Sequence, residues 1–253
     1  MSRIIAIANQ KGGVGKTTIT FNLGGALAEL GQKVLLIDLD PQGNLSSVFI
    51  DNIHNLSKTI ADILLEDQAE FEEVINKTQI PNLDLIASNL ALNDIDTRLA
   101  GDDDAQYMLI DEIKELKDSY DYILIDCPPN LGKATRIALV TAQELLIPIE
   151  CQGWAVKGSS QLLAYVEKIR KKANPNLRVL GFLINKYDPR RNIEKNYYKV
   201  LKETYKDLIF KAKFYNHVQY TEAATNQKPI TMYLPHSRQA RAYRKLAQEI
   251  IYG

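Results

Sequence analysis

The feature that most constrains this chain is a glycine-rich segment, NQKGGVGKTT at positions 9–18, placed between an apolar run and a helical pattern. The apolar run Ile4–Ala8 has the length of a strand, and the apolar residues of Thr17–Leu30 recur at helical spacing. A glycine-rich turn between a strand and a helix lets backbone N–H groups curl around phosphate oxygens, where the helix dipole also favours an anion. The segment therefore predicts a phosphate-binding loop.

The rest of the chain alternates apolar runs of strand length with helical patterns, which is typical of a parallel sheet covered on both faces. We expect an α/β fold, a doubly wound and mostly parallel sheet with helices on both faces, whose ligands lie beyond the carboxyl ends of the strands. The predicted strands are Ile4–Ala8, Val34–Ile37, Leu83–Ile86, Tyr122–Ile125, Leu145–Ile149 and Val179–Ile184. The predicted helices are Thr17–Leu30, Ala105–Lys117, Ala134–Thr141, Ser159–Lys172, Ile193–Lys206 and Ser237–Ile251, with Asn93–Asp104 as a surface connection.

Composition is consistent with one soluble domain spanning residues 1–253, with no helix-turn-helix domain before the loop. Charged residues make up 25% and hydrophobic residues 45% of the chain, and no apolar run approaches the ~20 residues of a membrane span. Cys127 and Cys151 lie in apolar runs without metal-ligand spacing, so we expect neither zinc nor a disulfide. The expected location is the cytoplasm.

Each loop residue has a chemical task. Three glycines let the backbone approach the phosphates: Gly12, Gly13 and Gly15. Lys16 supplies a positive charge for the β- and γ-phosphates, and the Thr17 hydroxyl is placed to ligate Mg²⁺. The common pattern G-x-x-x-x-G-K-[ST] is not met, because Gln10 stands five positions before Gly15. The loop instead reads K-G-G-x-G-K-T-T and opens with a second lysine, Lys11.

Carboxylates follow two of the predicted strands. Asp38 and Asp40 come at the end of one, and Asp126 ends another. In a parallel sheet these ends lie at the edge where the phosphates bind. Because phosphate does not sit beside carboxylates without a cation between them, the sequence predicts Mg²⁺ there.

Several motifs together resemble the deviant-Walker-A ATPases of the MinD/ParA superfamily, and among them the ParA/Soj partition branch. The motifs are KGGVGKTT, LLIDLDPQGN at 35–44 and YILIDCPPNLG at 122–132, with weaker likeness in IPIECQGWAVKGSSQLL and NQKPI. The resemblance implies an ATP hydrolase with ATP and Mg²⁺ as cofactors. It assigns nucleotide binding to Lys11, Gly12, Gly13, Val14, Gly15, Lys16, Thr17, Thr18 and Asn185, catalysis to Lys11, Lys16 and Asp40, and the metal to Thr17, Asp38 and Asp126.

The resemblance also implies how these residues act. Lys11 reaches across a nucleotide-sandwich homodimer to the partner's phosphates. Asp126 holds Mg²⁺ through water, Asp38 supports the metal shell and Asp40 orients the attacking water. The two switch segments are 41–44 and 128–132. Asn185, followed by Lys186, resembles the element that reads adenine, although an asparagine at a strand end is also a common turn residue.

Charge is distributed unevenly along a chain whose net charge is zero. Residues 1–159 hold 12 Lys and Arg against 24 Asp and Glu, whereas residues 160–253 hold 19 against 7. This pattern favours a polyanion-facing C-terminal part, although self-association would also produce it. Two helical stripes are the candidate contacts to non-specific double-stranded DNA: Lys195, Lys199, Lys202 and Lys206 in the first, and Arg238, Arg241 and Lys245 in the second. Charged helix faces are also often merely solvated.

The packing side of the first striped helix is predicted to be Ile193, Tyr197, Val200, Leu201 and Thr204. Gln219 departs from the family pattern, because Soj-like chains carry a DNA-contacting arginine at the matching position. The chain is expected to segregate or position a plasmid or chromosome, with hydrolysis stimulated by a ParB-like or analogous cargo-bound adaptor. A first alternative is positioning of a microcompartment such as the carboxysome on the nucleoid. A second is a membrane-bound Min-type regulator.

Overall fold

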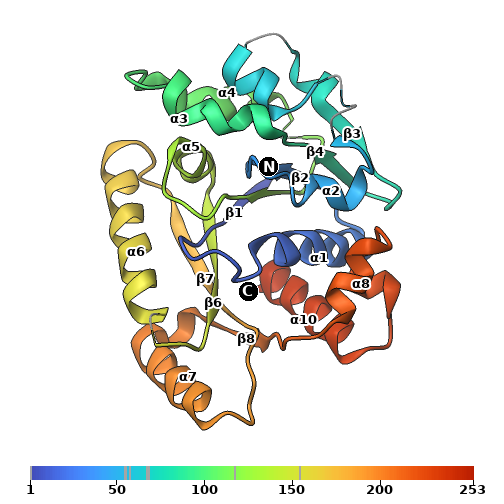
Figure 1. Cartoon of the computed structure of the whole chain (residues 1–253), viewed down its shortest axis with the longest axis vertical. Helices are drawn as coiled ribbons and strands as arrows, with labels where there is room; N and C mark the ends of the chain where they lie inside the picture. Colours follow the sequence, from blue (N-terminus) through green and yellow to red (C-terminus); the bar gives the residue numbers. More distant parts are fainter. Residues whose placement is uncertain (1, 54–55, 57, 67–68, 117, 154) are drawn as a thin grey trace.

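The computed structural model describes residues 2–53, 56, 58–66, 69–116, 118–153 and 155–253. Within them, eight strands form one sheet in the order β3-β4-β2-β5-β1-β6-β7-β8 (Figure 1). The strands are β1 Arg3–Ile7, β2 Val34–Asp38, β3 Ile75–Lys77, β4 Leu83–Ile86, β5 Tyr122–Asp126, β6 Glu144–Glu150, β7 Arg178–Asn185 and β8 Ile209–Lys213. All neighbouring pairs are parallel except β3 with β4. The predicted mostly parallel sheet is confirmed.

Helices connect these strands. The α-helices are α1 Lys16–Glu29, α2 Ser46–Phe49, α3 Ile95–Arg98, α4 Met108–Glu115, α5 Lys133–Thr141, α6 Ala155–Lys172, α7 Asn192–Tyr205, α8 Gln219–Thr225, α9 Ile230–Tyr233 and α10 Arg238–Tyr252. Shorter helical turns are η2 Asp62–Glu66, η3 Phe71–Val74, η4 Leu90–Asp94, η5 Asp104–Tyr107 and η6 Lys206–Leu208. Lys117, the last residue of one predicted helix, lies outside the described residues.

The sheet separates two hydrophobic cores. Because successive strand residues point to opposite faces, Ile4 and Ala6 of β1 enter one core while Ile5 and Ile7 enter the other. The first core lies against α3 to α7, and the second lies against α1 and α10 (Figure 1). Burial on both faces explains why the central strands read as continuous apolar runs.

The sheet topology brings the functional loops together. Strand β1 lies between β5 and β6. The connection after β1 leads to β2 on one side, and the connection after β6 leads to β7 on the other. In register, Ile7 of β1 and Asp38 of β2 both lie level with Asp126 of β5. The loops after these three strands therefore meet at one edge, which is where open α/β sheets bind ligands.

The structure differs from the sequence predictions in several places. The edge strands β3 and β8 were not predicted, because β3 has three residues and β8 (IFKAK) alternates lysines with apolar residues. The stretch 93–104 is more than a surface connection: Ile95 in α3 and the following Leu99 are buried in the core. In the described part of the chain, no helix has the length and apolar character needed to cross a membrane.

The predicted packing side of α7 is partly wrong. Ile193 and Val200 are 59% and 44% exposed, and Thr204 is also exposed. The buried side instead holds Leu201 and Glu194. Burial of Glu194 is possible because its carboxylate accepts hydrogen bonds from the Asp188 N–H and from Arg191.

Candidate functional site

The predicted phosphate-binding loop lies between β1 and α1. Gly13 and Gly15 adopt left-handed backbone angles, with φ of 75° and 89°. At these angles a Cβ atom is strained, so glycine lets the chain curl back before α1 begins at Lys16. The loop borders a cavity of about 500 Å³, lined by Gly12, Gly13, Gly15, Lys16, Thr17, Thr18, Phe21, Asn22, Asp40, Gln42, Asn44, Val48, Pro129, Lys186, Tyr220, Thr221 and Ala224. Backbone donors, a lysine and hydroxyls thus converge on a space that suits a phosphorylated ligand.

Lys16 and Thr17 lie at the foot of this cavity, beside Asp126. The Thr17 hydroxyl donates to Asp126 Oδ2 at 2.7 Å, and the Thr20 hydroxyl lies 3.2 Å from Oδ1. Lys16 is 7% exposed, and burial lowers the pKa of its ammonium. Burial, followed by the charge of Asp38, raises the pKa of Asp126 to about 8. Buried acids with raised pKa values next to a lysine are typical of a functional site.

Asp38 shapes the turn that carries Asp40. One Asp38 oxygen accepts from the Asp40 N–H at 3.0 Å, and the other accepts from the Ser46 N–H at 2.9 Å and the Ser46 hydroxyl at 2.7 Å. Asp38 is fully buried, and burial raises its pKa to about 6. Asp40, in contrast, lines the cavity and accepts from the Gln42 N–H. The two acids therefore lie in different environments, one behind the turn and one facing the ligand space.

A bound magnesium ion fits the oxygen donors at this edge. The described residues contain no group of three or more acidic, histidine or cysteine side chains able to enclose a metal ion by themselves. Mg²⁺ characteristically keeps several waters and uses one or two protein oxygens together with substrate phosphates. Thr17 and Asp40 line the cavity, and the buried acids Asp38 and Asp126 lie behind them. A divalent cation there would favour the charged form of both buried acids.

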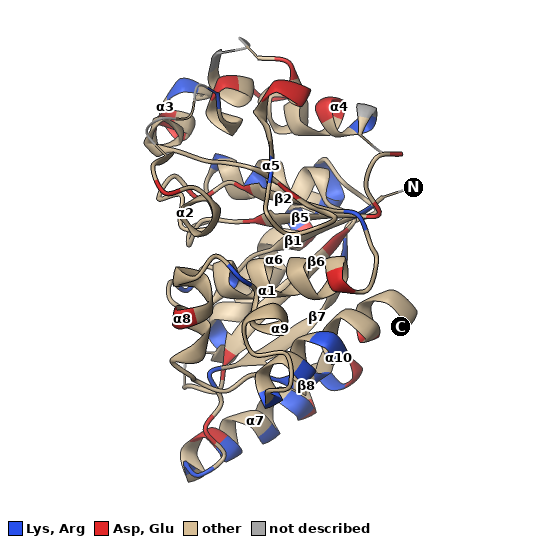
Figure 2. Ribbon diagram, turned by 90° about the vertical axis from the view of Figure 1, so that its right-hand side faces the viewer, with Lys and Arg blue, Asp and Glu red and all other residues tan. Residues whose placement is uncertain are grey.

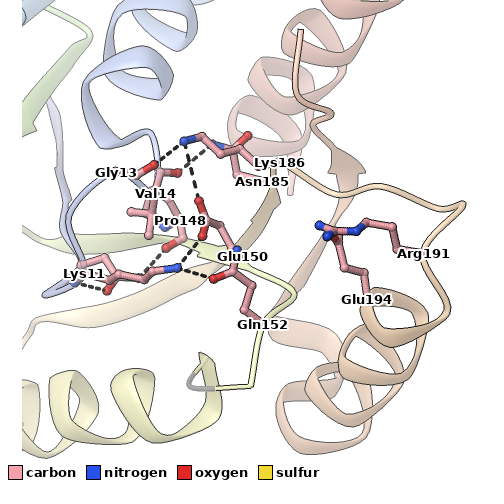
Figure 3. Close-up of polar contacts among 11 residues, drawn as sticks. Lys11, Gly13, Val14, Pro148, Glu150, Gln152, Asn185, Lys186, Arg191 and Glu194 are labelled. Carbon is pink, nitrogen blue, oxygen red and sulfur yellow. Dashed lines mark hydrogen bonds and ion pairs between the residues drawn. The ribbon is translucent and has the colours of Figure 1, made fainter.

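Asn185 and Lys186, at the end of β7, hold the loop from its other side (Figure 3). The Asn185 amide donates to the Val14 carbonyl at 2.7 Å, and the Lys186 ammonium donates to the Gly13 carbonyl at 2.5 Å. Lys186 lines the cavity, whereas Asn185 does not. Asn185 thus supports the loop in this structure, and a contact with adenine stays a prediction.

Lys11 points away from the cavity that Lys16 enters. Its ammonium donates to Oε2 of Glu150, the last residue of β6, at 2.5 Å and to Oε1 of Gln152, two residues further on, at 2.7 Å (Figure 3). Its side chain is 49% exposed. The two loop lysines therefore lie in separate environments, and Glu150 and Gln152 are site residues that the sequence motifs did not reveal.

The predicted cationic stripes lie at one end of the molecule. In Figure 2 the ribbon positions of Lys and Arg residues gather on α7, β8 and α10, and acidic residues lie at the opposite end around α3 and α4. The candidate cations on α7 and α10 are all exposed, and Lys206 lies just past the α7 C-terminus. Within the described residues, none of these seven forms an ion pair with an acid, whereas Arg244 on α10 pairs with Glu29. The seven charges thus stay available to an external anion.

The N-termini of α7 and α10 meet at a second cavity of about 460 Å³, which Arg190, Arg191 and Arg238 help to line. Arg190 pairs with Asp188 and Arg191 with Glu194, while Arg238 lies over the Tyr215 ring. The sequence analysis did not include Arg190 and Arg191 among the candidate cations, because they lie in a loop and not in a helical stripe. Gln219, the departure from the family pattern, accepts a hydrogen bond from Gln239 of α10.

Comparisons with known proteins agree with this geometry. A family model described as an AAA domain matches residues 2–179. The sporulation initiation inhibitor protein Soj of Bacillus subtilis is 38% identical over 250 residues, which cover 99% of this chain and 98% of Soj. The chromosome partitioning protein ParA of Caulobacter vibrioides is 36% identical over 251 residues, covering 98% of this chain and 94% of ParA.

Solved structures of similar proteins have the same fold. The septum site-determining protein MinD of Pyrococcus horikoshii, complexed with Mg-ADP, is 29% identical with a TM-score of 0.81 and covers 100% of this chain and 97% of MinD. The Mycobacterium smegmatis protein described as cobyrinic acid a,c-diamide synthase, with bound ADP and magnesium, is 29% identical with a TM-score of 0.87, covering 99% and 94%. The predicted resemblance and fold are confirmed. This chain belongs to the ParA/Soj family of partition ATPases.

Proposed function

We propose that this chain is a nucleotide-driven positioning switch that binds ATP with Mg²⁺, dimerises across the nucleotide and then holds DNA without sequence preference. Slow hydrolysis, stimulated by a cargo-bound adaptor, releases the DNA. The cargo is a plasmid or chromosome, and the ATP-bound dimer resides on the nucleoid in the cytoplasm. Family membership supports the ATPase chemistry, and the arrangement of the cations supports the dimer and the DNA.

Side chains of the cavity supply the elements that phosphoryl transfer needs. Lys16 and the loop N–H groups would hold the β- and γ-phosphates, and Thr17 would hold a Mg²⁺ that neutralises their charge. Asp40 faces the cavity, where its carboxylate accepts a hydrogen bond from the attacking water and so orients it. Asp38 and Ser46 fix the turn that places Asp40. Catalysis then comes from positioning and charge, because the transferred phosphoryl group needs little covalent help.

One observation supports the proposed dimer: Lys11 lies outside the nucleotide cavity of its own chain. Its side chain is half-exposed and borders a separate, smaller cavity with Glu150 and Gln152. In this position it cannot contact a phosphate bound by Lys16 of the same chain. A second copy facing the loop would bring its own phosphates to Lys11. ATP then becomes part of the interface, and its loss opens the dimer.

The test compares Lys11→Ala with Lys16→Ala by light scattering and by binding of a fluorescent ATP analogue. Lys11→Ala should bind the analogue nearly as well as wild type but dimerise weakly, because only the contact with the facing subunit is lost. Lys16→Ala should lose both, since its ammonium enters the cavity. Dimerisation of Lys11→Ala at wild-type ATP and protein concentrations would contradict the sandwich arrangement.

The exposed cations on α7 and α10 support non-specific DNA binding. Neutralised phosphates release counterions, and the slope of log affinity against log salt changes by about 0.9 per contact on B-DNA. Each single change, such as Lys199→Ala or Arg241→Ala, should therefore flatten the slope by about one unit if that side chain contacts a phosphate. Sequence preference should stay unchanged.

A charge-reversed variant separates DNA binding from dimerisation. Changing Lys195, Lys199, Lys202 and Lys206 together to Glu should abolish DNA binding but leave ATP-dependent dimerisation intact. None of the four lines the nucleotide cavity or the smaller cavity beside Lys11. An unchanged salt slope would show that α7 is merely solvated, and loss of dimerisation would place the stripe in the subunit interface.

A further inference from the structure

Glu150 is a buried acid with two lysines beside it, one from each side of the phosphate-binding loop. Its side chain is 9% exposed. Glu150 Oε2 accepts from Lys11 at 2.5 Å, and Glu150 Oε1 lies 3.7 Å from the Lys186 ammonium (Figure 3). Lys186 lines the nucleotide cavity and Lys11 does not. A single carboxylate therefore contacts both the lysine that must leave for a facing subunit and a lysine that stays.

This arrangement allows Lys11 to leave Glu150 without leaving the buried carboxylate unpaired. An acid that loses its partner in a buried site is strongly unfavourable, which would normally prevent Lys11 from departing. Here Lys186 remains close enough to keep the carboxylate compensated. Gln152, which also accepts from the Lys11 ammonium, is neutral and exposed, so breaking this hydrogen bond costs little free energy. Lys11 thus has two accessible positions, one on Glu150 and one in solvent or on a partner.

We propose that Glu150 is a positioning residue that holds Lys11 on its own subunit and so opposes dimerisation until nucleotide in a facing subunit competes for the lysine. This inference rests on the proposed ATP-dependent dimer. It adds that the nucleotide-free chain is restrained and that Glu150 sets the ATP and protein concentrations at which the dimer forms. The Lys11–Glu150 contact must break in both subunits when a dimer forms, so the factor by which one contact changes the dimerisation constant enters twice.

The test measures the dimer dissociation constant at saturating ATP and Mg²⁺ by sedimentation, for wild type and for Glu150→Gln, which removes charge but keeps shape. A partly exposed ion pair changes an equilibrium by roughly threefold. Two such pairs predict a dissociation constant about tenfold lower in Glu150→Gln. Gln152→Ala should shift it in the same direction by less than about threefold.

Two comparisons make the result specific to Lys11. In a Lys11→Ala background, Glu150→Gln should have no effect, because the restrained group is gone. Glu167→Gln, which breaks an exposed ion pair with Arg170 on α6, is the matched control and should dimerise as wild type. An unchanged or raised dissociation constant in Glu150→Gln overturns the inference, as does a lowered one that persists without Lys11.

A second readout does not need the dimer. In the nucleotide-free protein, an amine-reactive reagent should modify Lys11 about three times faster in Glu150→Gln than in wild type, with exposed Lys195 as the internal reference in peptide mass spectrometry. Equal Lys11 rates overturn the inference. Failure of the wild-type protein to dimerise with ATP would instead overturn the proposed function, and the labelling rates would still decide whether Glu150 restrains Lys11.

Discussion

Replacing Gly15 by alanine should damage the nucleotide-free fold more than the same change at Gly13, although both glycines are left-handed. An added Cβ at Gly13 meets nothing within 4 Å, whereas at Gly15 it would lie 2.4 Å from the Asn185 amide nitrogen. That amide must then move and release the Val14 carbonyl, which it bonds at 2.7 Å. Gly15→Ala therefore adds a broken buried hydrogen bond to the backbone strain that both variants share.

The expected magnitudes follow from these two effects. Left-handed backbone disfavours a non-glycine residue by about 1–2 kcal/mol, which is the whole effect at Gly13. A buried carbonyl left without a donor adds about 1–3 kcal/mol at Gly15. For a domain of this size each kcal/mol lowers Tm by about 2–4 °C, so we expect a fall of roughly 2–8 °C for Gly13→Ala and about 4–20 °C for Gly15→Ala.

Thermal unfolding without nucleotide, followed by circular dichroism, measures the difference. Asn185→Ala supplies the cross-check: it should destabilise the wild type by about 1–3 kcal/mol but cause little further loss in the Gly15→Ala background, because the same hydrogen bond is already broken. Equal Tm values for the two glycine variants, or full additivity of Gly15→Ala with Asn185→Ala, would refute the role given to Asn185 as a support of the loop.

Three further predictions concern single side chains. Asp40→Ala should bind ATP normally but hydrolyse it at least about 100-fold more slowly, measured by phosphate release, and loss of ATP binding would show a structural role instead. Asn22→Ala should lower stability by about 1–3 kcal/mol in denaturant unfolding, because the buried Ile230 N–H loses its acceptor. Raised folded-state pKa values, about 6 for Asp38 and about 8 for Asp126, mean that the metal-free protein loses stability as pH rises from about 4 to 8. Asp126→Asn should flatten that decline, and an unchanged pH profile would contradict the assignment.

The parts of the site that could be predicted from the sequence are those encoded locally. A glycine-rich turn, a lysine and a threonine lie within a few residues of one another, and Asp38 and Asp126 directly end apolar strands. A parallel sheet places such strand ends side by side, so their register could be anticipated. The family motifs add chemistry to positions that the pattern had already marked.

Contacts between distant residues could not be predicted in this way. Lys11 and Glu150 are 139 positions apart, and the charge of Glu150 within an apolar strand gives no sign of its partner. The orientation of α7 was predicted from apolar residues alone, whereas Glu194 is buried because Arg191 and a backbone N–H compensate it. Buried polar groups with long-range partners therefore limit what periodicity can predict.

The central claim is that the bound nucleotide controls the affinity of the protein for DNA. A single binding experiment tests it most directly. The affinity of the wild-type protein for a random-sequence duplex is measured by fluorescence anisotropy at fixed salt, without nucleotide, with ADP and Mg²⁺, and with ATP and Mg²⁺. We expect strong binding only in the presence of ATP and Mg²⁺, because only the dimer places the cationic ends of two chains on one duplex. The dimer doubles the number of phosphate contacts and so steepens the dependence of affinity on salt. Equal affinity and equal salt slope in all three states would contradict the account.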